Sequence, residues 1–283
     1  MISGRVGIAH PTVLWSVVEL LPVLSTDLLA FYRRVSQQTL TVVDVETTGH
    51  RASGGCRVIE MSVLQATLTD GILQQQTHLV NPQVPVPAMI TRFTGIDQAM
   101  VDQALLAEDV WHQYLPLLNA GILTAHNLAF DYAFLCAEFD QLGIEFSRSP
   151  AEQLCTVILA RLMLPELPSR SLPDLVKHFQ FPVGHSHRAE ADTIACWLLA
   201  KRLLTEVQNE SDEVLLKRFV QQWLPLGDAA ALLGCSGKQA RSRLEKAGVF
   251  PKFVGRHKTP MYQRGRVERV ILEQSEPVQL SWL

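Results

Sequence analysis

The first half of the chain carries short apolar runs of strand length, separated by turn signals. Leu40–Glu46 is rich in β-branched residues and ends at Thr47-Thr48-Gly49, so it predicts a buried strand followed by a turn. Asp70-Gly71 lies between two further runs and is the strongest short hairpin signal in the sequence. Residues 81–87 contain three prolines, which predicts an extended loop. The predicted strands span residues 40–46, 57–67, 72–80 and 121–126.

Beyond residue 100 the apolar positions recur every three or four residues, which is typical of helices. Ser171 is followed three positions later by Asp174, a spacing like that of a capping box, which predicts a helix start. Hairpin strands followed by alternating helices and strands predict an α/β layer domain with a mixed sheet. The predicted helices span residues 102–119, 130–142, 155–164, 171–178 and 189–204.

The N-terminal segment is apolar from Thr12 to Leu24. This stretch is too short to span a bilayer, which takes about 20 residues, and it contains Glu19 and Pro22. A signal peptide is the weaker alternative, because no cleavage site flanked by small residues follows. We therefore expect residues 1–38 to form a helical extension, and we expect no membrane partner.

Composition and charge divide the rest of the chain. With 47% apolar and 19% charged residues, the 283-residue chain can bury a sizeable core, which excludes wholesale disorder. Residues 206–213 are polar and charged, so we place a linker at 206–221, between a main domain at 39–205 and a smaller unit at 222–283. The smaller unit has a net charge of +5 and the remaining residues −8, within a total of −3. A basic unit attached to an acidic body favours a polyanionic partner.

Cysteine usage points to a reducing compartment. The five cysteines are scattered and none forms a CxxC pair. A disulfide framework or a zinc ribbon is therefore not expected, and the sequence predicts free thiols in a cytoplasmic protein.

Three groups of acidic residues suggest chemistry. Asp44 and Glu46 lie two positions apart in an apolar strand, so they share one face and repel each other. The alternative is a strand end where both reach solvent. Asp131 falls in the first turn of a predicted helix, where an acidic residue can simply favour the helix dipole. His187 precedes Asp192 by five residues, and an isolated histidine–aspartate pair on a surface usually has no function.

Together these groups favour a metal-dependent phosphoryl transfer. Four carboxylates suit two divalent ions such as Mg²⁺, which prefers oxygen ligands. Two such ions can hold the attacking and leaving oxygens of an in-line displacement at phosphorus. A neutral histidine nearby can accept the proton of the attacking water.

The three motifs resemble those of the DEDD-type 3′→5′ exonucleases, in the histidine subclass that includes the DnaQ-like proofreading subunits. The motifs are Val-Val-Asp44-Val-Glu46-Thr-Thr-Gly, Ala-His-Asn127-Leu-Ala-Phe130-Asp131 and His187-Arg-Ala-Glu-Ala-Asp192. The resemblance covers about residues 39–204 and implies a ribonuclease H-like α/β fold. It implies that two Mg²⁺ or Mn²⁺ ions bind Asp44, Glu46, Asp131 and Asp192, that His187 is the general base, and that Thr47, Thr48, Asn127 and Phe130 contact the substrate or position the site.

Two positions qualify the resemblance. His185 is a rival for the base, but only His187 has the five-residue offset to Asp192. Cys155-Thr156 stands where many relatives have Asp-Thr, outside the metal set, so we expect consequences for packing only.

The basic unit has the spacing of a helix–turn–helix. Residues 226–234 and 237–248 are two short helical patterns with Cys235-Ser236 between them, and residues 253–262 predict a basic hairpin before a last helix. The unit resembles the winged helix–turn–helix of excisionase-like and MerR-like DNA-binding proteins. The alternative is a solvated helical cap that docks on the main domain. The candidate DNA contacts are Lys238, Gln239, Arg241, Arg243, Arg256 and Lys258.

The sequence thus favours a metal-dependent 3′→5′ exonuclease that releases nucleoside 5′-monophosphates from single-stranded or frayed DNA 3′ ends, in proofreading or repair. An exoribonuclease is the first alternative, because the acidic residues interact with the metal and the phosphate and do not distinguish ribose from deoxyribose. A DNA-binding regulator or polymerase accessory with a vestigial nuclease domain is the second. A DNA polymerase is the candidate protein partner.

Overall fold

A mixed six-stranded sheet forms the centre of the main domain in the computed structural model, which describes residues 24–184 and 187–275. The strand order is β4-β3-β2-β1-β5-β6. The three long strands form an antiparallel meander, and β5 and β6 add in parallel to its β1 edge. The predicted hairpin and mixed sheet are confirmed. The strands are β1 (Leu40–Thr47), β2 (Val58–Thr67), β3 (Gly71–Asn81), β4 (Leu105–Leu106), β5 (Ile122–Ala125) and β6 (Gln153–Cys155).

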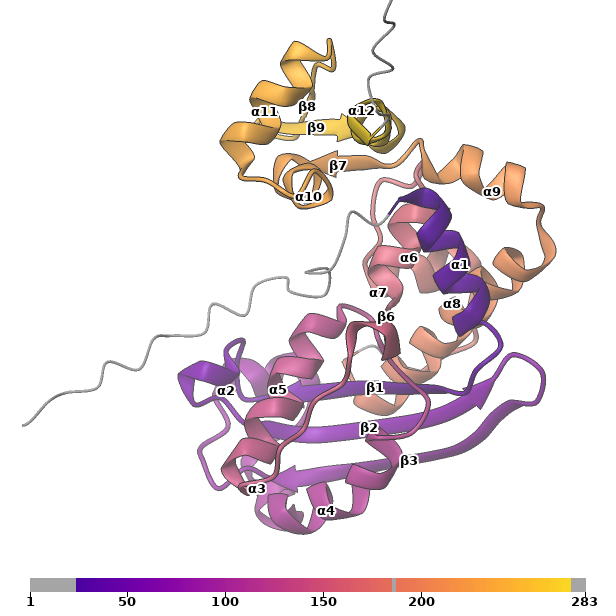
Figure 1. The fold of residues 1–283 in the computed structure, drawn as a ribbon. Coiled ribbons are helices and arrows are strands. Elements are labelled where there is room, and N and C mark those ends of the chain that lie inside the picture. The colour runs from indigo at the N-terminus through magenta and orange to yellow at the C-terminus, as the bar shows by residue number, and fades with distance from the viewer. Residues whose placement is uncertain (1–23, 185–186, 276–283) are drawn as a thin grey trace, which may run out of the picture.

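Helices cover both faces of this sheet (Figure 1). One face packs against α1 (Ser25–Val35), α6 (Thr156–Met163), α7 (Leu172–Phe179), α8 (Ala189–Asn209) and α9 (Asp212–Phe219). The other face packs against α4 (Ala107–Leu118) and α5 (Leu128–Gln141). Two shorter helices, α2 (Ala88–Thr94) and α3 (Gln98–Asp102), and the 3-10 turns η2 (Ala52–Gly54) and η3 (Pro150–Glu152) complete this part.

Strand alternation in β1 decides which face receives the acidic residues. Leu40 and Val42 are buried among the residues that pack on α8, whereas Val43 and Val45 are buried on the side of α4 and α5. Because side chains two positions apart share a face, Asp44 and Glu46 continue the row that faces α8. The sequence pattern of β1 therefore directs both carboxylates toward α8, which carries Asp192 in its first turn.

The predicted linker at 206–221 is wrong. Helix α8 continues to Asn209, and α9 follows after two residues. Leu215 and Phe219 are fully buried in the core that α8 shares with the sheet. The polar character of this segment comes from the exposed faces of two helices, where ion pairs such as Lys217–Glu213 lie.

The predicted N-terminal extension at 1–38 also needs correction over the part that is described. Helix α1 buries Leu29, Tyr32 and Val35 in the same core as α8. It is thus an integral layer of the main domain. Residues 1–23 lie outside the described part of the chain.

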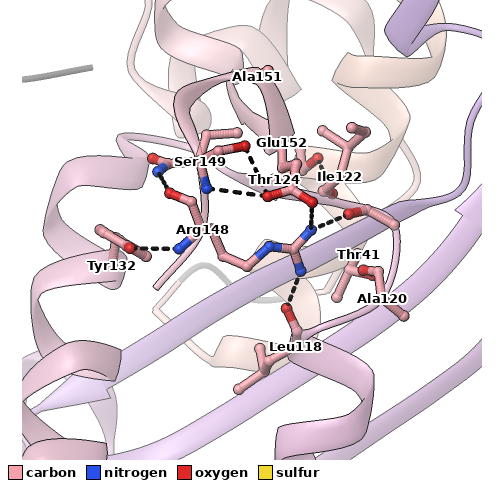
Figure 2. Close-up of polar contacts among 12 residues, drawn as sticks. Thr41, Leu118, Ala120, Ile122, Thr124, Tyr132, Arg148, Ser149, Ala151 and Glu152 are labelled. Carbon is pink, nitrogen blue, oxygen red and sulfur yellow. Dashed lines mark hydrogen bonds and ion pairs between the residues drawn. The ribbon is translucent and has the colours of Figure 1, made fainter. Parts of the chain in front are cut away.

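Arg148 connects the elements on either side of β5 (Figure 2). Its guanidinium donates to the backbone carbonyls of Leu118, at the end of α4, and Gly121, just before β5. Its backbone N–H donates to the hydroxyl of Tyr132 on α5. Arg148 is 7% exposed, so these bonds are shielded from water and fix the start of α5, where Asp131 lies.

Residues 223–275 form a second unit with its own core, drawn in orange to yellow in Figure 1. Ser236 caps α11 by accepting a hydrogen bond from the backbone of Gln239, in the turn predicted between two helices. The strand β7 had no signal in the sequence, because three residues are too few to show a period. The winged helix–turn–helix assignment remains a prediction. The elements are β7 (Trp223–Pro225), α10 (Leu226–Leu232), α11 (Gly237–Lys246), β8 (Lys252–Val254), β9 (Thr259–Gln263) and α12 (Arg264–Ser275).

This second unit contacts α1 and the end of α9. Ser25, at the start of α1, donates from its backbone and its hydroxyl to the Glu268 carboxylate on α12. The backbone N–H of Gly265 donates to the carbonyl of Val220, and an added Cβ at Gly265 would lie 2.7 Å from the Val220 Cβ. The close approach at this joint therefore requires glycine. No helix within 24–184 and 187–275 is long and apolar enough to cross a bilayer.

Candidate active site

Three carboxylates from β1 and α8 meet at one edge of the sheet. Asp44, Glu46 and Asp192 each offer an oxygen, and these oxygens lie within 4.8 Å of one another. Asp44 and Glu46 come from one face of β1, and Asp192 comes from the first turn of α8, which packs on that face. The spacing in β1 and the position of α8 thus bring together side chains almost 150 residues apart in the sequence.

Asp131 lies beside this cluster rather than in it. Its carboxylate is 3% exposed and accepts a hydrogen bond of 3.2 Å from the backbone N–H of Val45. That N–H is free to donate because β1 pairs with β5 only as far as Val42. Asp131 therefore joins α5 to the strand that carries Asp44 and Glu46.

The electrostatics of the cluster are those of like charges in a confined space. Burial, followed by the charge of Asp131, raises the pKa of Asp44 well above its ordinary value. Burial, followed by the charge of Asp192, raises the pKa of Glu46 to about 8. The pKa values of Asp131 and Asp192 are also raised, in both cases chiefly by burial. The carboxylates therefore resist ionisation together unless a positive charge joins them.

A divalent cation fits this donor set. The three clustered groups are hard oxygen donors, the kind that Mg²⁺ and Mn²⁺ prefer. Arg188 is the cation that lowers the pKa of Glu46, but its guanidinium is paired with a different carboxylate. The acidic triad is thus consistent with binding of a divalent metal.

His187 lies next to the triad through its backbone. Its N–H donates a 2.9 Å hydrogen bond to Asp192, and its φ of 68° places it in the left-handed region. The imidazole packs on the ring of Phe93, with ring centroids 3.8 Å apart. Phe93 is 58% exposed, so this contact lies at the surface of the site. The rival residue His185 lies outside the described residues.

The remaining predicted site residues have mainly local roles in the structure. The Thr47 hydroxyl donates to the carbonyl of Gly49, and the Thr48 hydroxyl accepts from the backbone of Arg57, so both hold the turn after β1. Asn127 precedes α5 with a φ of 75° and lines the cavity described below. Phe130 is partly buried against the core on the α5 side.

Glu60 and Arg188 belong to the surroundings of the site, and neither was predicted from the sequence. Glu60 pairs across the sheet with Glu46 and is 1% exposed. It binds the Arg188 guanidinium at 2.5 Å and accepts a hydrogen bond from the backbone of Ala189, the first residue of α8. A single acidic residue in the apolar run 58–64 was the available signal, but its partner lies 128 positions away.

A cavity of about 730 Å³ extends from the triad along α6 and α7. Asp44, Asp192 and His187 line one part of it, together with Asn127. Its other lining residues include His126, Arg161, Arg170 and the loop of Pro168 to Ser171. The carboxylates are thus accessible from a space of the size typical of ligand sites.

The candidate DNA contacts of the second unit divide into two groups. Gln239 accepts hydrogen bonds from Ser236 as part of a capping box, and Arg243 donates to the carbonyl of Leu233, so both side chains are used within the unit. The other four are exposed: Lys238, Arg241, Arg256 and Lys258.

Comparison with known proteins identifies the domain. A family model described as Exonuclease, of the RNase T type, matches residues 41–199. Over 186 residues the chain is 30% identical to DNA polymerase III PolC-type of Caldanaerobacter subterraneus, covering 63% of this chain and 13% of that protein. Over 193 residues it is 29% identical to the 3′-5′ exonuclease DinG of Bacillus subtilis, covering 67% of this chain and 20% of that protein. The chain thus spans a fifth or less of the length of these two relatives.

Two solved structures share the fold. The chain matches E. coli exonuclease I in complex with a dA16 oligonucleotide at a TM-score of 0.53 and 16% identity, over 63% of this chain and 42% of that one. It matches the nuclease domain of 3′hExo, a DEDDh family member bound to rAMP, at a TM-score of 0.50 and 17% identity, over 59% of this chain and 92% of that one. The predicted ribonuclease H-like α/β fold is confirmed. Since the Exonuclease model matches more than half of the residues, the chain belongs to the exonuclease family.

Proposed function

We propose that this protein is a metal-dependent 3′→5′ exonuclease that acts on DNA and releases nucleoside 5′-monophosphates. The observation that carries the proposal is the cluster of Asp44, Glu46 and Asp192, whose oxygens lie within 4.8 Å of one another. Asp44 and Asp192 line a cavity that His187 also lines. Asp131 completes the acidic set through its bond to the backbone of β1.

Two divalent ions, Mg²⁺ or Mn²⁺, would be held by Asp44, Glu46, Asp192 and Asp131. Bound there, they would neutralise the carboxylates and stabilise the charge that develops on the phosphoryl oxygens. The chain itself supplies the positioning, through the pairing of β1 with β2 and the packing of α8 on their shared face.

His187 is the proposed general base. A water oxygen bonds to phosphorus while the bond from phosphorus to the 3′ oxygen of the preceding nucleotide breaks, and the imidazole accepts the proton of that water. The departing 3′ oxygen takes a proton from solvent, so the products are a nucleoside 5′-monophosphate and a strand that ends in a 3′ hydroxyl. The His187 backbone bond to Asp192 keeps this residue beside the acidic set, and its imidazole packs on the ring of Phe93.

The preference for DNA rests on the second unit. We propose that residues 222–283 form a winged helix–turn–helix whose exposed Lys238, Arg241, Arg256 and Lys258 contact phosphates. The net charge of +5 in this segment supports the proposal, since phosphate contacts dominate affinity for nucleic acid. The PolC-type relatives make a DNA polymerase the candidate protein partner.

The test is a cleavage assay with the purified chain and Mg²⁺ or Mn²⁺. Substrates labelled at the 5′ end would be single-stranded DNA, 3′-recessed DNA, mismatched DNA and RNA of the same sequence. The expected result is a ladder that shortens from the 3′ end, faster on DNA than on RNA, and that requires the metal. Cleavage from the 5′ end, or no cleavage with either metal, contradicts the proposal, whereas faster cleavage of RNA supports the exoribonuclease alternative.

A further inference from the structure

The cavity beside the triad is lined by side chains of opposite charge. Asp44 and Asp192 lie where the scissile phosphate would be cleaved, and Arg161 and Arg170 line the same cavity together with polar and apolar side chains. Nothing in the acidic chemistry requires these arginines. They come from α6 and from the loop before α7, outside the three acidic motifs.

Neither arginine is bound directly by a carboxylate. Within residues 24–184 and 187–275, neither Arg161 nor Arg170 forms an ion pair, although Glu166 lies near enough to Arg170, and Asp228 near enough to Arg161, for their charges to interact. Arg170 donates from Nη2 to the carbonyl of Leu164, but its Nε is buried and has no hydrogen-bond partner. Two guanidinium groups on one cavity wall repel each other, and a buried N–H without an acceptor is unfavourable. An anion in the cavity would relieve the repulsion between the two guanidinium groups.

His126 fixes both arginine-bearing segments. Its Nε2 donates a 3.0 Å hydrogen bond to the carbonyl of Arg170, so Nδ1 accepts the 2.9 Å hydrogen bond from the hydroxyl of Thr156. Thr156 is the first residue of α6, the helix that carries Arg161. One imidazole therefore links the Thr156 side chain at the start of α6 to the backbone of the loop that carries Arg170. This link fixes the two arginine-bearing segments relative to each other, while the Arg161 side chain itself is exposed.

We infer that Arg161 and Arg170 bind a non-scissile phosphodiester of the nucleic acid strand, one of the linkages on the 5′ side of the bond that is cleaved. This inference rests on the proposed exonuclease function and adds a second phosphate subsite to it. A guanidinium group presents paired donors that match the oxygens of a phosphate. A cavity of about 730 Å³ is larger than one phosphate needs and suits a ligand of nucleotide size or more.

The first experiment pairs protein variants with single neutral linkages. Single-stranded DNA substrates carry one methylphosphonate at the second, third or fourth linkage from the 3′ end, and release of the terminal nucleotide gives kcat/KM. For the wild type, we expect one of these positions to lower kcat/KM about ten- to a hundred-fold, the scale of one charge-assisted hydrogen bond. Arg170→Gln and Arg161→Gln should each lower kcat/KM on the native strand. In these variants, a methylphosphonate at the position that slows the wild type should cause little further loss of kcat/KM.

Arg202→Gln is the matched control, because Arg202 is an exposed guanidinium on α8 that does not line the cavity. Its kcat/KM and its response to methylphosphonates should equal those of the wild type. The inference would be overturned if each methylphosphonate lowered the kcat/KM of the Arg170→Gln enzyme by the same factor as that of the wild type. The effects of the variant and of the neutral linkage would then be independent.

A second substrate separates a phosphate subsite from damage to the site or the fold. The p-nitrophenyl ester of thymidine 5′-monophosphate contains a single phosphate, so it cannot use a second subsite. The ratio of strand to ester kcat/KM should fall at least about ten-fold in the two cavity variants. An equal loss on both substrates overturns the inference while leaving the exonuclease function in place. A wild type that cleaves neither substrate contradicts the exonuclease function itself.

Discussion

In the exonuclease domain the candidate functional charges line or adjoin a cavity within the fold, whereas in the second unit they lie on its surface. Asp131 is buried and Asp44 is half-buried, and burial raises the pKa values of both. Lys238 and Arg241, in contrast, project from the exposed side of α11. The side chains that this helix contributes to the core are small or aliphatic. A fold keeps like charges buried together only when a ligand offsets the cost, so the acidic cluster indicates function far more strongly than the basic surface does.

The strongest test of this difference between the two units is to replace one of the clustered carboxylates. Asp44→Asn or Asp192→Asn should slow nucleotide release by at least about 10³-fold, because each removes a proposed ligand of the metal ions. Without metal, both variants should unfold at a higher temperature than the wild type, since one of several repelling carboxylates is gone.

Rates measured at saturating Mg²⁺ and thermal unfolding with and without EDTA check both parts of this prediction. Asp140→Asn, on the exposed side of α5, is the control and should change neither quantity. A ligand variant that retains more than about a tenth of wild-type activity would remove that residue from the metal set.

Replacement of His187, the proposed general base, should have the next largest effect. His187→Ala is expected to slow the chemical step about 10²–10⁴-fold while metal binding persists. Single-turnover rates at saturating metal measure this effect. A large loss in His185→Ala together with a near-normal His187→Ala would reverse the assignment.

Glu60 offers a test of how the acidic cluster is held. Glu60→Gln weakens the attachment of Arg188 and of the start of α8, so Asp192 should be less well placed. We expect kcat to fall about ten-fold and the Mg²⁺ concentration for half-maximal rate to rise, with KM little changed. Measurement of kcat and KM over a Mg²⁺ titration tests this expectation.

Glu138→Gln provides the matched comparison, because Glu138 is equally buried and is paired with Arg57. It should lower the unfolding temperature without moving the Mg²⁺ midpoint. The same midpoint shift in both variants would mean that Glu60 acts through general stability. In that case Glu60 is not a positioning residue for α8.

The sequence was sufficient for the parts of the fold that have a clear period. The alternation in β1 and the Asp70-Gly71 turn predict the meander, and the placement of Asp44 and Glu46 on one face follows from the same alternation. Strands of two or three residues, such as β4 and β6, are too short to show a period, and they become strands only by pairing with a longer neighbour.

The parts that could not be predicted depend on contacts between distant segments. Composition at 206–221 indicates a polar surface, but it cannot show that Leu215 and Phe219 on the same segment are buried against the main core. The bond from His126 to the Arg170 carbonyl joins positions 44 residues apart, and no local pattern contains that information. The carboxylates could be found because their chemistry requires fixed residue types, whereas their supporting contacts could not.

The smallest expected effect concerns the surface charges of the second unit. The double variant Lys238→Glu with Arg241→Glu should leave kcat on a short single strand near that of the wild type, since α11 lies outside the cavity. Its affinity for long DNA should fall, and the slope of log K against log salt should become shallower by about 0.9 for each phosphate that the variant no longer binds. Lys201→Glu with Arg202→Glu reverses the same charge on the exposed face of α8 and serves as the control. Equal salt slopes for the two double variants would show that the basic unit acts only through net charge, as a solvated cap would, and would contradict a DNA-binding role for α11.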